Sequence, residues 1–275
     1  MYKLAVLGNP IAHSLSPQIH QAFAQQFQLP LSYERITTTA DNFHQTIEHL
    51  RSNHYIGVNV TLPLKTLAFQ YATTQTPEAE LAQAANTLLF SKDEVIAHNT
   101  DGLGLIHDLK NNHHINLHKQ DILICGAGGA ARGILPLITE YNPNKVYLYN
   151  RTNQRLHRLI EDLKLSNCEQ LHKITFNTKI SPSLLINCIA QDGFYMQFKS
   201  TSLNLVQTFC YDLNYGHFHN SFVDVMKIQG NKNYCNGLGM LVAQAAKAFE
   251  FWFEQIPETQ SVLRLISAID KLPPS

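Results

Sequence analysis

Hydrophobic and polar positions along the first hundred residues predict an alternation of strands and helices. Short apolar runs between turn residues are typical of strands, and apolar residues three and four positions apart are typical of helices. Thr76-Pro77 has the sequence of a helix N-cap followed by the first helical residue. The expected strands are 3–7, 33–37, 56–60, 87–90 and 95–97, the last two forming a hairpin, and the expected helices are 17–27, 41–51, short segments after Lys65 and Thr76, and 102–112.

Residues 121–133 predict the start of a second α/β unit. Ile-Leu-Ile-Cys before a glycine cluster is typical of a fully buried parallel strand, followed by the tight turn that holds a dinucleotide pyrophosphate. Gly126 would make the turn, Gly128 would let the backbone approach the phosphates, and Ala131 would pack the helix on the strand. The phosphates would meet unpaired N–H groups of the helix. Close helix–strand packing alone also explains small residues here.

The next predicted strand, 145–149, ends at a basic segment. An NAD site usually carries an acidic residue at this place, but none occurs from Tyr141 to Ile160. Arg151, Thr152 and Arg155 stand there instead, and they suit a 2′-phosphate. The sequence therefore favours NADP over the alternative of solvated arginines at a helix start.

Later elements are expected as a helix after Arg155, strands at 184–189 and 208–213, and two C-terminal helices. The first of these helices opens at Gly237 and runs to Phe253, and the second covers about 258–271. Both C-terminal helices could return to the first unit, which would make that unit discontinuous.

Composition limits the partners and the setting. The chain has 275 residues, 44% of them hydrophobic, and a formal net charge of +0, which fits one large or two ordinary domains and gives no reason to expect nucleic acid or a membrane as partner. Five cysteines and fourteen histidines show no metal-ligand or redox spacing, and the histidines are expected mostly at the surface. The sequence predicts a reduced, cytoplasmic protein without a metal, a signal peptide or a membrane span.

Polar clusters follow the predicted strands, where ligands bind in α/β sheets. Ser14 and Ser16 precede a helix, where they form a possible carboxylate site, although Ser16 before Pro17 is also a good N-cap. Lys65 follows a strand and a proline-bent loop, a place where lysines are usually solvated. Asp101 is either a site residue or the cap of the following helix.

These motifs together resemble the shikimate dehydrogenase family over nearly the whole chain. The matching segments are G-N-P-I-x-H-S-x-S-P, N-V-T-x-P-x-K, A-x-N-T-L, N-T-D-G, G-A-G-G-A-x-R-G, N-R-T-x-x-R and G-L-G-M-L-V-x-Q-A-A. The resemblance implies two α/β domains with a cleft between them. Residues 1–101 plus 238–275 would form the substrate-binding and catalytic domain, and 102–237 would form a Rossmann-type NADP-binding domain.

The resemblance also implies a role for each matching residue. Lys65 and Asp101 would be catalytic, at the reacting oxygen. Ser14 and Ser16 would bind the substrate carboxylate, and Thr61, Asn86, Asp101 and Gln244 the ring hydroxyls, while Tyr215 would close the substrate site. Gly126, Ala127, Gly128, Gly129, Ala130, Asn150, Arg151, Thr152 and Arg155 would hold NADP, and Leu213 and Gly237 would flank its nicotinamide. Reduction of a ketone builds negative charge on oxygen, which a neighbouring ammonium can stabilise and protonate.

The implied activity is reversible, NADP-dependent reduction of 3-dehydroshikimate to shikimate, a step in chorismate and aromatic amino acid biosynthesis, by a monomer or homodimer. One alternative is an NAD-using quinate/shikimate dehydrogenase. Such relatives tend to replace the second serine by threonine and to carry an acid near Arg151, and this chain does neither. A second alternative is a catalytically silent dinucleotide-binding sensor, which is kept open by a departure from the family's Asn-Ala-Thr-Ser at 187–191. Asn236 and Pro77 are further departures, at positions that are often acidic.

Overall fold

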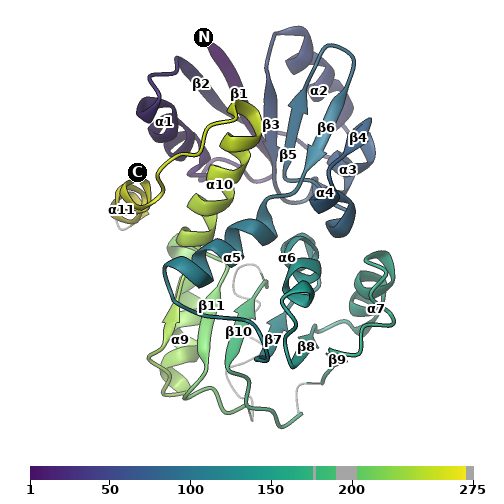
Figure 1. The fold of residues 1–275 in the computed structure, drawn as a ribbon, viewed down its shortest axis with the longest axis vertical. Helices are drawn as coiled ribbons and strands as arrows, with labels where there is room; N and C mark the ends of the chain where they lie inside the picture. Colours follow the sequence, from purple (N-terminus) through teal and green to yellow (C-terminus); the bar gives the residue numbers. More distant parts are fainter. Residues whose placement is uncertain (176–177, 190–202, 271–275) are drawn as a thin grey trace. The chain divides into compact units, whose positions relative to one another are not determined.

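The chain divides into two compact units, shown in the computed structural model of Figure 1. The structure describes residues 1–175, 178–189 and 203–270. Unit 1 comprises Met1–Leu105 and Leu241–Ile269, and unit 2 comprises Ile106–Met240 and Asp270–Ser275. Unit 1 is discontinuous in sequence because C-terminal helical residues return to it. The first two crossings between the units, at 105/106 and 240/241, lie a few residues beyond the expected positions, and a third crossing, at 269/270, was not expected.

Unit 1 is built on a six-stranded mixed sheet with the order β2-β1-β3-β5-β6-β4. Its strands are β1 (Tyr2–Gly8), β2 (Leu31–Thr37), β3 (Gly57–Val60), β4 (Thr74–Gln75), β5 (Thr87–Phe90) and β6 (Val95–His98). β1 runs parallel to β2 and β3, whereas β5 is antiparallel to β3 and β6. All four residues of β3 are buried, as expected for a strand that is covered on both faces.

Helices cover both faces of this sheet. The helices of unit 1 are α1 (Ser16–Gln26), α2 (Phe43–Ser52), α3 (Lys65–Tyr71), α4 (Pro77–Ala82), most of α10 (Leu238–Phe253) and α11 (Gln260–Asp270). α5 (Asp101–Asn111) begins in unit 1 and continues into unit 2. Phe43 and Ile47 of α2 pack on one face, and Trp252 of α10 packs on the other. The Trp252 Nε1 donates to the Leu88 oxygen at 3.0 Å, and a Cβ on Gly57 would lie only 2.5 Å from that nitrogen. Residue 57 is therefore glycine because the indole needs its space.

Unit 2 contains a six-stranded sheet with the order β12-β11-β10-β7-β8-β9, in which every neighbouring pair is parallel. Its strands are β7 (Asp121–Cys125), β8 (Lys145–Tyr149), β9 (Leu171–Lys173), β10 (Leu184–Asn187), β11 (Phe209–Asp212) and β12 (Tyr234–Cys235). Its other elements are α6 (Gly129–Glu140), α7 (Asn153–Asp162), the 3₁₀ helix η1 (Gly216–His219) and α9 (Asn220–Ile228). This strand order is the doubly wound arrangement of dinucleotide-binding sheets.

The predicted fold class is confirmed, and each strand and helix expected by residue range is present within a few residues. Thr76 caps α4 as expected, since its side chain accepts a hydrogen bond from the Ala79 N–H. The end of the last expected helix, at Lys271, lies outside the described residues. β4 and β12 were not expected, because two residues are too few to show a period. α9 was not expected either, since its nine residues include two valines, which favour strands.

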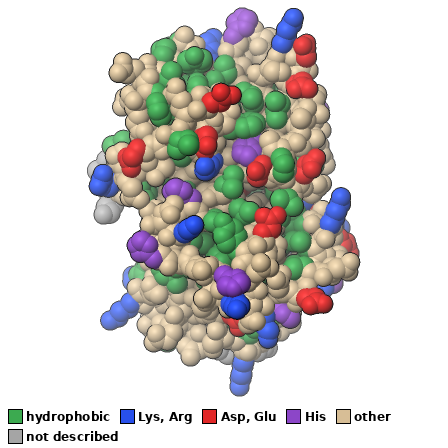
Figure 2. Space-filling model, in the orientation of Figure 1, with side chains coloured by type: hydrophobic (Ala, Val, Ile, Leu, Met, Phe, Trp, Pro, Cys, Tyr) green, Lys and Arg blue, Asp and Glu red, His purple; other side chains and the backbone are tan. Residues whose placement is uncertain are grey.

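The surface carries charged side chains of both signs, as the balanced composition suggests (Figure 2). Figure 2 shows acidic, basic and hydrophobic side chains interspersed over one face. Within the described residues, none of the helices has both the length and the apolar character to cross a membrane, and no cluster of three potential metal ligands occurs. No disulfide joins the five cysteines, all of which lie in the described part of the chain. The expectation of surface histidines is wrong for His20 and His98, which are buried.

Candidate active site

The polar residues singled out in unit 1 lie at one edge of its sheet. Near the ends of β1 and β3, Leu7 lies beside Val60. Thr87, the first residue of β5, pairs with Asn59 on one side and with His98, the last residue of β6, on the other. Four parts of the chain therefore lie together at this edge of the sheet: segments 9–16, 61–65 and 99–101, and residue Asn86.

Ser14 and Ser16 form a hydrogen-bonded pair at the start of α1. The Ser14 hydroxyl donates to the Ser16 Oγ at 3.1 Å and accepts from the Ser16 backbone N–H at 3.3 Å. Arg35 donates to the backbone oxygen of Ser14 at 2.7 Å, which places a cation near a helix N-terminus that already favours anions. The interpretation of Ser16 as the N-cap is wrong, because Ser16 is the first residue of α1 and Leu15 is its N-cap.

Lys65 and Asp101 form a shielded ion pair. The Lys65 Nζ lies 2.6 Å from the Asp101 Oδ2, and the two side chains are 17% and 6% exposed. Lys65 is the first residue of α3 and Asp101 the first residue of α5. The Asp101 backbone N–H donates to Asn99 Oδ1 at 3.0 Å, so Asn99 supplies the contact typical of a helix cap. The alternatives of a solvated Lys65 and a merely capping Asp101 are therefore wrong.

The Asn86 amide links this ion pair to two neighbours. Its Nδ2 lies 2.8 Å from Thr100 Oγ1, 2.9 Å from Asp101 Oδ1 and 3.2 Å from Gln244 Oε1. An amide nitrogen has two hydrogens and cannot donate to all three at once; the Thr100 hydroxyl is a further donor to Gln244 Oε1, at 3.3 Å. Thr100 was not expected in the site, although it belongs to the N-T-D-G motif. We call Lys65, Asn86, Thr100, Asp101 and Gln244 the polar cluster.

Two glycines permit close contacts around the polar cluster. A Cβ on Gly104 of α5 would lie 2.6 Å from the Cβ of Gln244, so the glycine lets α10 bring Gln244 close to α5. A Cβ on Gly8 would lie 2.5 Å from the Thr61 methyl group. Thr61 is further fixed by its backbone N–H, which donates to the Leu7 oxygen at 2.9 Å.

The residues expected to hold NADP lie at the carboxyl edge of the sheet in unit 2. Cys125, the last residue of β7, pairs with Tyr149 of β8 and with Asn187 of β10, and Asn187 pairs with Asp212 of β11. The segments after these four strands therefore begin side by side. Dinucleotides bind at this edge of a doubly wound sheet, where neighbouring strands turn to opposite sides.

The turn after β7, which is expected to bind the pyrophosphate, combines a left-handed glycine with open space. Gly126 has a φ of +112° and lies against the backbone of Cys188, so it can only be glycine. Ala131 is fully buried, which fits helix–strand packing. Packing does not explain Gly128, because a Cβ there would meet no atom within 4 Å. That open space lies next to Gly129 and Ala130 at the start of α6, where helix N–H groups have no partner within the helix.

The segment after β8 presents two arginines to solvent. Asn150 Nδ2 donates to the Thr152 backbone oxygen at 2.9 Å and holds the turn into α7. Arg151 and Arg155 are exposed. The residues present thus fit a dinucleotide with a 2′-phosphate. Backbone N–H groups and open space follow β7, and two arginines without an acidic neighbour in sequence follow β8.

Leu213 and Gly237, which are expected to flank the nicotinamide, are in direct contact with each other. A Cβ on Gly237 would lie 2.3 Å from the Leu213 oxygen, and the Gly237 N–H donates to Asn214 at 3.0 Å. Tyr215 follows in the same segment, half-buried and directly before η1. Tyr215 belongs to unit 2, unlike the other residues expected to bind the substrate.

The segment after β10, where the sequence departs from the family pattern, is held by a buried carboxylate. Asp212 Oδ1 accepts from Asn187 Nδ2 at 2.8 Å, and Asp212 Oδ2 lies 2.7 Å from His219 Nδ1. Asn214 Nδ2 donates to the Ile189 oxygen at 2.9 Å. The start of this loop is thus fixed by its neighbours, while Ala190 and Gln191 lie outside the described residues.

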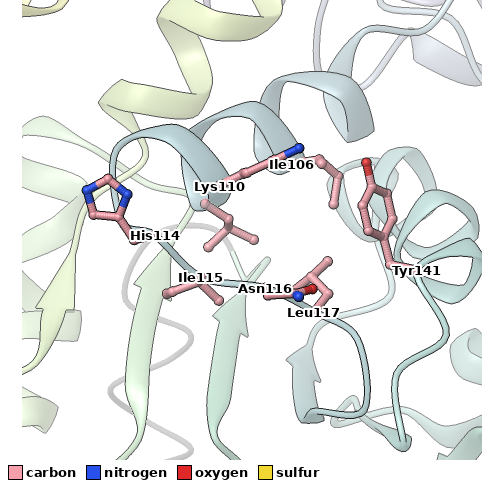
Figure 3. Close-up of a pocket in the computed structure, with 8 residues that line it drawn as sticks. Ile106, Lys110, His114, Ile115, Asn116, Leu117 and Tyr141 are labelled. Carbon is pink, nitrogen blue, oxygen red and sulfur yellow. The ribbon is translucent and has the colours of Figure 1, made fainter.

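A groove of about 370 Å³ in unit 2 is separate from the predicted cofactor residues (Figure 3). It is lined by Ile106, Leu109, Lys110, His114, Ile115, Asn116, Leu117 and Tyr141. Tyr141 follows the C-terminal end of α6, whereas the glycine turn lies at its N-terminal end, 12 residues away. A helix of that length spans about 18 Å, so the groove is not the dinucleotide site.

A doubly wound sheet with an open glycine turn, together with a second α/β unit that carries a shielded Lys–Asp pair, defines a dinucleotide-dependent oxidoreductase. Protein-family models narrow this class. The Shikimate dehydrogenase substrate binding domain matches residues 6–88, and the Shikimate 5′-dehydrogenase C-terminal domain matches residues 237–266.

Known relatives cover nearly the whole chain. Shikimate dehydrogenase (NADP(+)) of Vesicomyosocius okutanii is 41% identical over 96% of this chain and 98% of the relative. The enzyme of the same name from Coxiella burnetii (strain Dugway 5J108-111) is 37% identical over 98% and 99%. The crystal structure of Shikimate 5-Dehydrogenase from Thermus thermophilus in complex with NADP(H) and shikimate is 30% identical, with a TM-score of 0.83 over 98% of this chain and 100% of that one. The chain belongs to the shikimate dehydrogenase family.

Proposed function

We propose that this protein catalyses the reversible, NADP-dependent reduction of 3-dehydroshikimate to shikimate. The observation that carries the proposal is the shielded pair of Lys65 and Asp101, 2.6 Å apart, surrounded by the amides of Asn86 and Gln244. The names of the relatives, and the Thermus structure with NADP(H) and shikimate, support the choice of substrate and cofactor.

In this mechanism Lys65 donates a proton to the oxygen of the ketone as it becomes an alkoxide. Asp101 holds the ammonium in place and keeps a counter-charge beside it, so the dyad needs little rearrangement at the moment of reaction. Asn86, Gln244 and Thr61 hydrogen-bond the ring hydroxyls. The hydroxyls of Ser14 and Ser16 bind the carboxylate at the start of α1, near Arg35.

Unit 2 holds the cofactor. Gly126 to Ala130 bind the pyrophosphate, while Asn150, Arg151, Thr152 and Arg155 bind the adenosine ribose and its 2′-phosphate. Leu213 and Gly237 would flank the nicotinamide, and Tyr215 would contribute to substrate binding. NADPH supplies the two electrons that the reduction requires. We further propose a cytoplasmic setting, which is supported by five cysteines without a disulfide and by a biosynthetic role.

Steady-state rates with shikimate and with quinate, each with NADP and with NAD, test the proposal. We expect turnover of shikimate with NADP to exceed the other three combinations. Lys65→Ala protein, purified in the same way, controls for host enzymes. Preference for quinate or NAD would favour a quinate/shikimate dehydrogenase, and cofactor binding without turnover would favour a sensor.

A further inference from the structure

Four side chains form a hydrogen-bonded series that ends on Asp101. The Tyr33 hydroxyl donates to Asn59 Oδ1 at 2.6 Å, and Asn59 Nδ2 donates to Thr87 Oγ1 at 3.1 Å. The Thr87 hydroxyl donates to Asn86 Oδ1 at 3.0 Å, and Asn86 Nδ2 donates to Asp101 Oδ1 at 2.9 Å. All these residues belong to unit 1, and each of them is at most 6% exposed.

The chemistry of these groups allows only one direction along the series. A carboxylate accepts but cannot donate, so Asn86 must turn its NH₂ group towards Asp101. Its oxygen then faces the other way and accepts from three donors: the Thr87 hydroxyl, the Thr100 N–H at 3.0 Å and the Thr100 hydroxyl at 3.2 Å. The Thr87 hydroxyl can donate its hydrogen to Asn86 Oδ1, because a lone pair on the same oxygen accepts the hydrogen bond from Asn59 Nδ2. The Asn59 oxygen in turn needs the Tyr33 hydroxyl.

Tyr33 is itself held in place. Its ring stacks on the His20 imidazole at a centroid distance of 4.7 Å and an interplanar angle of 6°. Burial raises the pKa of the Tyr33 hydroxyl well above its usual value, against smaller opposite effects of the Ser16 hydroxyl and the Arg35 cation. The hydroxyl therefore keeps its proton and stays a donor, and the serine pair lies beside it.

We infer that Tyr33 and Thr87 are positioning residues, which set the orientation of the Asn86 amide and through it the charge and geometry of the Lys65–Asp101 pair. Neither side chain hydrogen-bonds to Lys65 or Asp101, and Thr87 is fully buried. Without the series, the Asn86 oxygen keeps only its contacts with Thr100, and the amide is held less firmly with its NH₂ group towards the Asp101 carboxylate. The inference rests on the proposed function for its catalytic consequence but not for the orientation of the amide.

Three variants test the series. Tyr33→Phe and Thr87→Val keep the shape of the side chain and remove one hydroxyl, and Thr87→Ser keeps the hydroxyl. We expect the first two to lower kcat about tenfold. We also expect them to change the pH profile of kcat, because the Asn86 amide beside the Lys65–Asp101 pair is then less firmly oriented. Thr87→Ser should behave like the unmodified protein.

Tyr55→Phe is the matched control for Tyr33→Phe. Its hydroxyl also donates at 2.6 Å, to Glu34, but at the surface and outside the series. A Tyr55→Phe protein with unchanged kcat and pH profile supports the inference. A loss in Tyr55→Phe as large as that in Tyr33→Phe would show that removal of any phenol hydroxyl suffices.

A second measurement does not need turnover. The side-chain NH₂ signals of Asn86 in ¹H–¹⁵N spectra should shift in Tyr33→Phe and Thr87→Val and remain unchanged in Thr87→Ser and Tyr55→Phe. Unchanged Asn86 signals and an unchanged pH profile in the first two variants would overturn the inference. If the unmodified protein lacks shikimate dehydrogenase activity, the proposed function fails, and the Asn86 signals still decide the inference.

Discussion

In unit 1 Lys65, Asn86 and Asp101 are shielded and bound to one another, whereas in unit 2 the residues expected to bind the cofactor phosphates are exposed or border open space. Asp101 is 4% exposed and hydrogen-bonded to both Lys65 and Asn86. Arg151 and Arg155 are exposed, and no atom lies near the position of a Cβ on Gly128.

The difference follows from what each unit must bind. Uncharged hydroxyls and a proton transfer require donors and acceptors that are fixed in advance, because an unpaired buried polar group is costly. Phosphates carry charge and bind well to exposed cations and helix N–H groups, which water solvates until the ligand arrives. Substitutions should therefore affect chemistry and stability in unit 1 and only cofactor binding in unit 2.

The largest effect is expected for Lys65→Ala. Removal of the proton donor should lower kcat by about 10²–10⁴-fold and leave the KM for NADP nearly unchanged. The matched control is Lys92→Ala, which removes an exposed lysine of the same unit. If Lys65→Ala keeps near-full kcat in steady-state assays, Lys65 is an ordinary structural lysine.

Arg151→Ala is expected to weaken NADP binding by about 10- to 150-fold, because a hydrogen bond to a charged group contributes about 1.5–3 kcal/mol. NAD lacks the 2′-phosphate, so its dissociation constant should hardly change. Calorimetric titration of both cofactors measures the difference, with exposed Arg264→Ala as control. An equal loss for NADP and NAD would remove Arg151 from the 2′-phosphate site.

Two glycine substitutions compare the units directly. Gly104→Ala forces a methyl group against the Gln244 backbone, 2.7 Å from its nitrogen, and should lower the free energy of unfolding by about 1–3 kcal/mol. Gly128→Ala meets no atom within 4 Å, so it should leave the unfolding free energy unchanged and weaken NADP binding. Urea unfolding and cofactor titration measure both. Equal destabilisation by the two substitutions would contradict the comparison.

The smallest expected effect is the change of stability with pH that is caused by His20, whose ring stacks on that of Tyr33. Burial lowers the pKa of His20 from 6.5 to about 3, against a smaller opposite effect of Asn59. The folded protein then binds fewer protons than the unfolded chain, so stability is complete above pH 6.5 and falls towards pH 3. The expected slope from this residue is about 1.4 kcal/mol per pH unit.

His20→Phe should remove this slope and keep the aromatic packing, whereas exposed His118→Phe should retain it. The fluorescence of Trp252, the single tryptophan of the chain, reports on unit 1 during unfolding. An equal slope in the two variants would assign the acid sensitivity to other groups.

The sequence predicts the fold well where apolar runs are long and regular. The strands around Leu4 and Leu123 and the helices α1, α6 and α10 follow directly from their periods and flanking residues. α9 and the two-residue strands β4 and β12 could not be predicted, because they depend on tertiary pairing more than on local pattern.

The residue types of the site could be read from motifs, but their partners could not. Tyr33 and Asn59 are 26 positions apart, and they meet only because β1 lies between β2 and β3 in the sheet. Ser16 looks like an N-cap in sequence, yet it is the first residue of α1. Its hydroxyl oxygen therefore accepts a hydrogen bond from Ser14 and does not cap the helix. His20 has no signal at all, since a histidine on a helix is more often exposed.

A double-mutant cycle on Lys65 and Asp101 tests the central claim, that the two residues serve one proton transfer. kcat would be measured for Lys65→Ala, Asp101→Asn and the double variant. If the pair acts as a unit, the double variant should lose no more than the larger single loss, within about twofold. A double variant that loses the product of the two single losses would show that Lys65 and Asp101 act independently.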